Sequence, residues 1–414
     1  MAGLMLGAAL CALPASAQQN SCIDCHGSLD PPLQVTAEQF AADIHAQKGL
    51  NCASCHGGDP TKADMEAMSK KAGFRGKPDK KQIPEFCGRC HSDGTYMRQY
   101  NPSLRTDQLA QYKTSVHGQR LAHGDTKVAV CIDCHSVHGI RPASDPRSTV
   151  NPLKVAETCS RCHSNADYMK EYKIPTDQFA NYSKSVHHDA MVVRGDLSAP
   201  TCTTCHGNHG AAPPGVGSVR NVCSTCHVFQ SQMFDKSTHK AAFEKAGLPG
   251  CVVCHSNHAV KHPSDAMLST GPESVCIRCH LPGDHCDRAT TVIHADLLRL
   301  DGAIKDADAV LAVAESSGME VSEARLNQDQ ARDELTKARV TIHSFHKELV
   351  KQDIDAGLKV AGANLQAGKD ALRERDYRRV GLAISVVFIL IVLLGLRAYI
   401  RFIERDAKLS EGTP

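Results

Sequence analysis

The chain has 414 residues, of which 20 are cysteine and 23 are histidine, and its formal net charge is +2. This nearly balanced charge gives no sign of nucleic-acid binding, and 20 cysteines are far more than a protein of the reducing cytosol keeps without a use for them. Tryptophan is absent and aromatic residues make up 4% of the chain, so the polypeptide alone offers little material for a large apolar core.

The first segment, residues 1–17, is predicted to be a signal peptide. An apolar run ends in Ala15, Ser16 and Ala17, the small-x-small pattern that precedes signal-peptide cleavage. The mature protein would begin near Gln18, and Cys11 would leave with the signal peptide. The usual basic residues before the apolar run are missing, which leaves the true start of the protein open.

Residues 18–288 contain nine copies of C-x-x-C-H, and every C-x-x-C in the chain is followed by histidine. A zinc ribbon has no reason to place a histidine after each pair of cysteines, and a disulfide framework would not keep the spacing constant. A c-type haem needs two thiols at this distance for its thioethers and an adjacent imidazole for its iron. We therefore expect nine covalently attached haem c groups. The cysteines that would hold them are Cys22, Cys25, Cys52, Cys55, Cys87, Cys90, Cys131, Cys134, Cys159, Cys162, Cys202, Cys205, Cys223, Cys226, Cys251, Cys254, Cys276 and Cys279.

The haem region has roughly 30 residues for each motif, too few to wrap each porphyrin separately. The haems are therefore expected to pack against one another and to supply much of the core. The expected fold class is mainly α with much irregular structure, in which short helices carry the motifs between loops rich in glycine and proline.

An internal repeat organises these motifs. The stretch from Tyr96 to Gly118 reappears from Tyr168 to His188, and in both copies one C-x-x-C-H precedes it and a C-x-x-C-H-x-x-H follows. A shortened third copy begins at Cys223, a degenerate first copy begins at Cys22, and Cys276 begins an unfinished unit. The chain thus predicts a linear array of haem pairs.

The histidines divide into proximal and distal candidates. The proximal iron ligands would be the motif histidines His26, His56, His91, His135, His163, His206, His227, His255 and His280. Recurrence at matched repeat positions selects seven distal ligands: His45, His117, His187 and His239 from S-x-H-like sites, and His138, His209 and His258 from C-x-x-C-H-x-x-H. A ligand three residues after its motif has a short reach around its own porphyrin, so we expect it to serve a neighbouring haem. His123, His188, His262 and His285 are left unassigned. Met97 and Met169 are expected to pack and not to bind iron.

Residues 289–377 lack the motif and are rich in alanine, leucine and charged residues, interrupted by Ser316, Ser317 and Gly318. They predict two long helices in an antiparallel hairpin, which would place His294 and His343 at nearly the same level along the hairpin. We expect these two histidines to be the last two distal ligands. His346, one turn further, could replace His343. The alternative is that these are ordinary surface histidines. Cys286 is expected to be a free thiol.

Residues 378–398 are predicted to form a transmembrane helix. Val380 to Leu396 is apolar without a charge and spans most of a bilayer at about 1.5 Å per residue. A buried core helix is the alternative. Flanking charges are balanced, so the expected orientation comes from the haems, whose attachment takes place outside the cytoplasm. The protein would be a single-pass protein of the bacterial inner membrane with a periplasmic haem domain and a cytoplasmic tail, residues 399–414.

Between Ser21 and Cys286 the doubled motifs resemble multihaem c-type cytochromes of the class III-like kind from respiratory bacteria that export electrons. The resemblance implies low-potential bis-histidine haems that relay electrons from a quinol-oxidising membrane partner, cytochrome b-like or another multi-span protein, to periplasmic cytochromes, reductases or extracellular acceptors. It implies no catalytic residue. The C-terminal helices and terminal anchor depart from this family.

The alternative is a multihaem enzyme resembling nitrite reductase or hydroxylamine oxidoreductase, with one open iron. No C-x-x-C-K variant is present, and the histidines suffice for nine irons. The sequence therefore favours the electron conduit.

Overall fold

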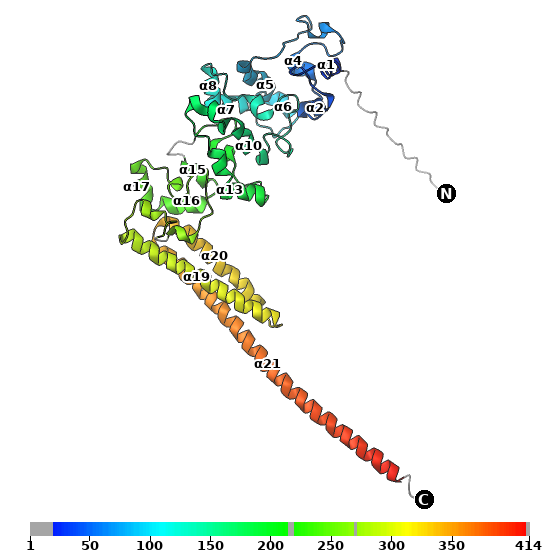
Figure 1. The fold of residues 1–414 in the computed structure, drawn as a ribbon, viewed down its shortest axis with the longest axis vertical. Coiled ribbons are helices and arrows are strands. Elements are labelled where there is room, and N and C mark those ends of the chain that lie inside the picture. Colours follow the sequence, from blue (N-terminus) through cyan, green and yellow to red (C-terminus); the bar gives the residue numbers. More distant parts are fainter. Residues whose placement is uncertain (1–19, 214–218, 269–270, 411–414) are drawn as a thin grey trace, which may run out of the picture. The chain divides into compact units, whose positions relative to one another are not determined.

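The computed structural model describes residues 20–213, 219–268 and 271–410 (Figure 1). The predicted signal peptide and Cys11 lie outside the described residues. Across the described ranges the chain forms helices and loops and no β-strand, so the predicted mainly α fold is confirmed. The chain divides into two compact units, Met1–Gly215 with Ser256–His262, and Val216–His255 with Pro263–Pro414. Each unit is described by itself.

The first unit consists of short helices separated by long irregular segments. Its α-helices are α1 (Ser21–His26), α2 (Ala37–Ala41), α3 (Ile44–Gln47), α4 (Cys52–His56), α5 (Ile83–His91), α6 (Gly94–Arg98), α7 (Gln108–Thr114), α8 (Val116–Ala122), α9 (Cys131–His135), α10 (Pro152–His163), α11 (Ala166–Met169), α12 (Gln178–Tyr182), α13 (Val186–His188) and α14 (Cys202–His206). Single 3-10 turns cover Met65–Met68, Lys80–Gln82 and Lys170–Tyr172, and a π turn covers Asp189–Val193.

Buried apolar side chains in the first unit are few and scattered. One small cluster joins Ile83, Leu121, Val128 and Val130, and another holds only Ala190, Met191 and Ala199. Met97 and Met169 are also buried, as their predicted packing role requires. Such small clusters cannot by themselves provide the apolar burial that a domain of this length needs.

The second unit combines two further motif helices with three long ones. Its α-helices are α15 (Val219–Ser224), α16 (Val228–Asp235), α17 (Thr238–Ala246), α18 (Cys251–His255), α19 (His285–Ser316), α20 (Ser322–Thr341) and α21 (Lys347–Ser410), with 3-10 turns at Asp265–Leu268, Cys276–Arg278 and Ile342–Ser344.

The three long helices pack side by side around a continuous apolar core (Figure 1). Leu297 and Leu300 of α19 and Val350 of α21 are fully buried, because apolar residues recur at helical spacing on the facing sides. The predicted hairpin turn is present, with Gly318 at φ 77°. The helices contain a second break that was not predicted, at the 3-10 turn Ile342–Ser344 and at Phe345 with φ 56°. This break divides the expected second helix into α20 and α21.

Two buried amides link these helices. The Asn364 side chain donates to Gln328 Oε1 at 2.8 Å, and Gln328 Nε2 donates to the Ile304 carbonyl at 2.8 Å. Each of α19, α20 and α21 contributes one of these residues. Because both amides are almost fully buried, their hydrogen bonds fix the register of the three helices.

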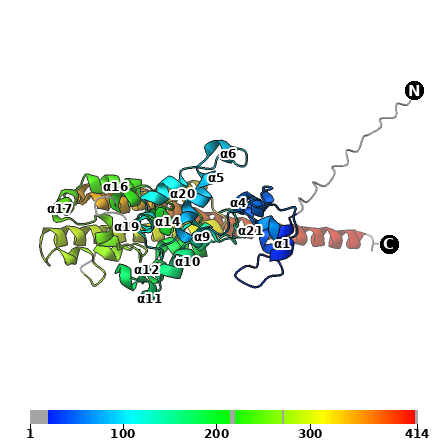
Figure 2. The same ribbon diagram turned by 90° about the horizontal axis from the view of Figure 1, so that it is seen from above.

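Helix α21 runs without interruption through the segment predicted to cross the membrane (Figures 1 and 2). Its most apolar 18-residue window has a mean hydropathy of 2.7, and none of that window is buried against protein. Apolar side chains from Val380 to Ile403 are about half exposed or more. The structure therefore contains one candidate membrane-spanning helix, and the absence of burial disfavours a core helix.

Candidate haem-binding sites

The C-x-x-C-H motifs occupy short helical turns whose first residues are capped locally. In α4, Asn51 accepts from the Ser54 amide and Ser54 Oγ accepts from the Asn51 amide, both at 3.1 Å. In α9 the Val130 amide donates to Asp133 Oδ2 at 2.8 Å. These bonds satisfy amides that a helix of five residues leaves unpaired, and they hold both cysteines and the histidine on one turn.

Within three repeat units, the first cysteines of the two motifs lie close enough to perturb each other. Burial and Cys52 raise the pKa of the Cys22 thiol, Cys131 raises the pKa of Cys87, and Cys202 raises the pKa of Cys159. None of the cysteines that the structure describes forms a disulfide. Haems attached to the two motifs of one repeat unit would therefore be bound at adjacent cysteines, as the predicted haem pairs require.

Seven motif histidines each face a second histidine across a nearly constant distance. The ring centroids are 5.9 Å apart for His45 and His91, 6.1 Å for His117 and His163, and 6.0 Å for His56 and His138, His135 and His209, His206 and His258, His239 and His280, and His255 and His343. In every pair one ring belongs to a motif and the other to the predicted distal set. The two rings come from different motifs or repeat units.

This separation fits two imidazoles on one metal ion. Two metal–nitrogen bonds of about 2 Å each, plus the two ring radii, give roughly 6 Å between centroids. The paired rings are partly buried, and burial, together with the nearby His209 and His91, lowers the pKa of His135 to about 4. Burial is likewise the main cause that lowers the pKa of His117 and His343. The lowered pKa of His117, His135 and His343 favours the neutral imidazole, which is the form that binds iron.

The pairs follow one order along the chain. His45, His117 and His239 each face the motif that opens the next unit. In the reverse direction, His138, His209 and His258 each face the second motif of the preceding unit. The first and second repeat units in chain order, and likewise the second and third, therefore exchange one histidine in each direction. His343, from the 3-10 turn after α20, faces His255 where a following repeat would otherwise supply the ring.

A repeated backbone hydrogen bond positions these exchanged histidines. The amide of the residue before the S-x-H-like histidine donates to a carbonyl two residues beyond a C-x-x-C-H-x-x-H motif. These bonds run from Ile44 to Ile140 at 2.7 Å, from Val116 to Ala211 at 3.1 Å and from Val186 to Val260 at 2.8 Å. Both kinds of distal histidine are thereby tied to each other at each junction between units.

A buried helix cap precedes each of these histidines. Ser115 Oγ accepts from the Gly118 amide at 2.9 Å, and Ser185 Oγ accepts from the His188 amide at 3.1 Å. In the first repeat unit, which begins at Cys22, Asp43 takes the place of serine. Its Oδ1 accepts from His45 Nδ1 and from the His45 amide, both at 2.9 Å, and its Oδ2 accepts from the Ile140 amide at 2.9 Å. Asp43 therefore orients the His45 ring as well as its backbone.

The chain matches two family models and one curated relative. The models are described as cytochrome c-type protein NrfB-like, over residues 7–75, and cytochrome c3, over residues 44–164. The C-type polyheme cytochrome OmcC of Geobacter sulfurreducens is 22% identical over 218 residues, which are 46% of this chain and 26% of that protein. No solved structure matches. The chain is a multihaem c-type cytochrome. The matched stretch spans about a quarter of the length of OmcC.

These matches imply that the cytochrome carries covalently bound haem c. The polypeptide fits that cofactor, because neutral imidazoles face each other at the required spacing beside paired thiols, and the apolar core of the first unit is small. When bound, haem supplies one-electron chemistry at iron. The protein's own residues set the ligands, their hydrogen bonds and the surrounding burial.

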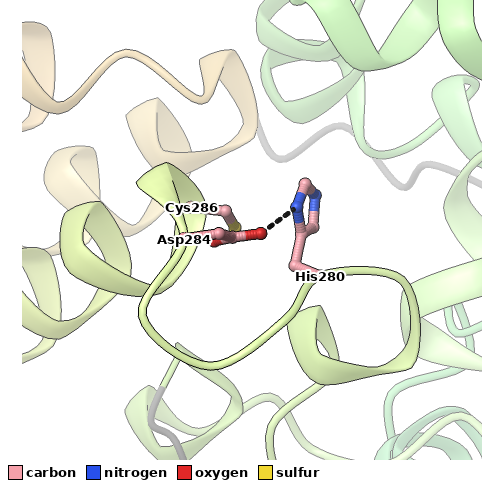
Figure 3. Close-up of side chains that lie close together, drawn as sticks. All are labelled: His280, Asp284 and Cys286. Atoms are coloured by element: carbon pink, nitrogen blue, oxygen red, sulfur yellow. Dashed lines mark hydrogen bonds and ion pairs between the residues drawn. The ribbon is translucent and has the colours of Figure 1, made fainter.

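In the ninth motif of the cytochrome, a carboxylate contacts the Nδ1 atom of the motif histidine (Figure 3). His280 Nδ1 lies 3.2 Å from Asp284 Oδ2, and Cys286 Sγ lies within 4.8 Å of both groups. Burial, together with the nearby Cys276 and Asp284, raises the pKa of the Cys286 thiol to about 12. A protonated thiol is a poor metal ligand, so the trio fits a histidine oriented by Asp284 better than a separate metal site.

Other motif histidines of the cytochrome donate to main-chain carbonyls instead. His26 Nδ1 lies 2.9 Å from the Leu33 carbonyl oxygen, His56 Nδ1 lies 3.0 Å from that of Gly76, and His206 Nδ1 lies 3.2 Å from that of Ala212. Each of these bonds fixes the ring so that Nε2 is left for iron. Carboxylate contacts at His45 and His280 are therefore distinctive within this cytochrome.

The remaining predicted ligands are placed differently. His187 and His227 both have partners within the chain. His294 is partly exposed on α19, and in the described part of the chain no motif histidine lies against it. The ring that faces His255 is that of His343, and His346 is exposed. Sequence reasoning did not find Asp43 or Asp284, although the aspartates two residues before His45 and four after His280 were visible signals.

Proposed function

We propose that this cytochrome carries nine haem c groups and relays electrons along them. The succession of histidine pairs carries the proposal, since seven irons held between two imidazoles leave no coordination position for a substrate. The eighteen motif cysteines, the nine motif histidines and the predicted distal histidines would hold the cofactors. Bis-histidine ligation without methionine favours low potentials.

The cytochrome would be exported by its signal peptide and anchored in the bacterial inner membrane by α21. The haem domain would face the periplasm, where c-type haem is attached, and the tail would be cytoplasmic. Electrons would come from a separate multi-span membrane protein that oxidises quinol and would leave to periplasmic or extracellular acceptors. A single span offers no pocket between helices for a quinol. The unbroken stretch from Lys347 to Val380, roughly 50 Å at 1.5 Å per residue, separates His343 from the apolar segment.

Two measurements test this proposal. The intact mass of the purified protein should exceed the mass of the mature polypeptide by nine haems, and fewer haems or a stoichiometric zinc content would contradict it. The protein reconstituted alone in liposomes with menaquinol should remain oxidised. Rapid, inhibitor-sensitive reduction without another subunit would show that the chain oxidises quinol itself.

The alternative function is a redox enzyme with one open iron. A specific observation favours keeping it: His26 is a motif histidine that lies against no second histidine in the described residues. One such site among paired irons is compatible with electron relay through the rest of the array.

A further inference from the structure

The first motif of the cytochrome differs from the paired ones in what faces its histidine. His26 is held like the others, with Nδ1 against the Leu33 carbonyl at 2.9 Å, so its Nε2 is left for iron. Yet among the described residues no imidazole stands opposite it, whereas seven other motif histidines have one at 5.9 to 6.1 Å. The residues that precede Ser21 in the printed sequence contain no histidine.

The histidines around the first motif are committed to other partners. The side chain of Asn20, the residue before α1, donates to Cys52 Sγ at 3.5 Å and so places the second motif beside the first, but His56 of that second motif pairs with His138. His45, the distal candidate of the same unit, pairs with His91 and is fixed there by Asp43. The exchange of histidines between neighbouring units thus consumes every nearby imidazole and assigns none to His26.

Two further histidines of the first compact unit, His123 and His188, have other contacts. His123 Nδ1 is bonded to the Gln119 carbonyl of its own helix at 2.7 Å, and the His188 ring lies against Tyr182 at 5.4 Å. Solvent also reaches this part of the fold, since Leu33, whose carbonyl orients His26, is 59% exposed. A small molecule can therefore approach this motif.

We propose that the iron held by Cys22, Cys25 and His26 has an exchangeable sixth position, which binds a small diatomic ligand in the ferrous state. This site goes beyond electron relay, because it adds one point where the array meets a dissolved molecule. It rests on the haem content proposed above. A five-coordinate iron of this kind is high-spin, whereas irons between two histidines are low-spin and closed.

Carbon monoxide titration of the reduced full-length protein tests the site. We expect one carbon monoxide bound per polypeptide and, in the oxidised protein, a high-spin signal from one iron. The double variant Cys22→Ala/Cys25→Ala should lose one haem by mass and all carbon monoxide binding. The matched variant Cys159→Ala/Cys162→Ala should also lose one haem but keep the carbon monoxide site.

A positive control shows that the assay detects an opened iron. His117→Ala removes the ring that faces His163 and should raise the stoichiometry from one to two. No carbon monoxide binding by a protein whose mass shows nine haems would overturn the inference while leaving the haem content intact. Binding that persists in Cys22→Ala/Cys25→Ala would also overturn it.

A methionine ligand is one way to close this iron. Ser21 is bonded to the Pro60 carbonyl through its amide at 3.0 Å and through Oγ at 2.8 Å, so the loop that leads to Met65 lies beside α1, and Met65 is 76% exposed. If carbon monoxide binds to Met65→Leu and not to the wild-type protein, Met65 is the sixth ligand and the proposal fails. One carbon monoxide bound per polypeptide in both proteins supports it.

Discussion

The rings of His135 and His209 lie nearly parallel, at an interplanar angle of 10° with centroids 6.0 Å apart, although His209 belongs to the motif of the following unit. His209 is only three residues beyond its own motif histidine, His206, which instead faces His258. A three-residue connection cannot carry a side chain to the far side of the cofactor on its own motif. The His209 ring therefore faces the preceding repeat unit, as expected if it serves a haem of that unit.

Replacing His209 should open one iron. In His209→Ala we expect one additional high-spin iron and one more carbon monoxide per polypeptide than in the wild-type protein, because the ring that faces His135 is lost. The exposed His123, bonded only within its own helix, provides the matched control His123→Ala, which should leave both values unchanged. An unchanged spin state in His209→Ala would contradict the assignment.

Asp284 should lower the reduction potential of the iron held by His280. A carboxylate that accepts from a ligand histidine makes the imidazole a stronger donor and stabilises the ferric state. In Asp284→Asn the asparagine oxygen can retain the 2.8 Å cap on the Asp287 amide, while an amide group replaces the charged oxygen that accepts from His280 and from the Leu281 amide.

We expect a positive shift of one potential, on the order of 60 mV for each tenfold loss of ferric preference. A redox titration followed by absorption measures it. Asp287→Asn, whose carboxylate accepts from the Gly283 amide and not from a histidine, is the control and should leave the titration unchanged. Identical curves for Asp284→Asn and the wild-type protein would rule out the tuning role.

Asp43 should make the stability of the first repeat unit sensitive to acid. Burial favours the neutral form of Asp43, but hydrogen bonds from His45 and from the Ile140 amide outweigh it and keep its pKa lowered. Because the folded-state pKa lies below the ordinary value of about 3.9, this stabilisation is complete above that pH and is lost as pH falls through the folded-state value.

Asp43→Asn keeps a capping oxygen but loses the charge, and should cost about 1 to 3 kcal/mol at neutral pH. Denaturant unfolding at pH 7 and near pH 3 measures the effect. The difference between variant and wild-type protein should shrink at the lower pH. A difference that stays constant with pH would show that the Asp43 charge contributes nothing.

The buried amides of Gln328 and Asn364 should stabilise the three long helices. Asn364→Ala leaves Gln328 Oε1 without its donor and should lower the free energy of unfolding by about 1 to 3 kcal/mol. Leu326→Ala, on the same helix as Gln328 but 72% exposed, should change it little. The double variant Gln328→Leu/Asn364→Leu should recover part of the loss, since both polar groups are then removed together. Urea unfolding followed by circular dichroism distinguishes these outcomes.

The sequence by itself determined the chemistry of this protein. Thioether attachment requires two thiols and an imidazole at fixed spacing within one helical turn, so nine local motifs identify the cofactor without knowledge of the fold. The same holds for α21, whose apolar segment follows from composition, and for the distal candidates, which recur at matched positions of the repeat.

Only the tertiary structure decided which rings face each other. The partner of His138 is His56, and that of His343 is His255, because backbone bonds between units and the break after α20 bring together residues from distant parts of the chain. That break depends on Phe345 adopting a left-handed conformation. Because this position does not carry glycine, the sequence did not indicate such a conformation there. Pairing across units is a property of packing and not of local spacing, and for the same reason the sequence could not single out His26.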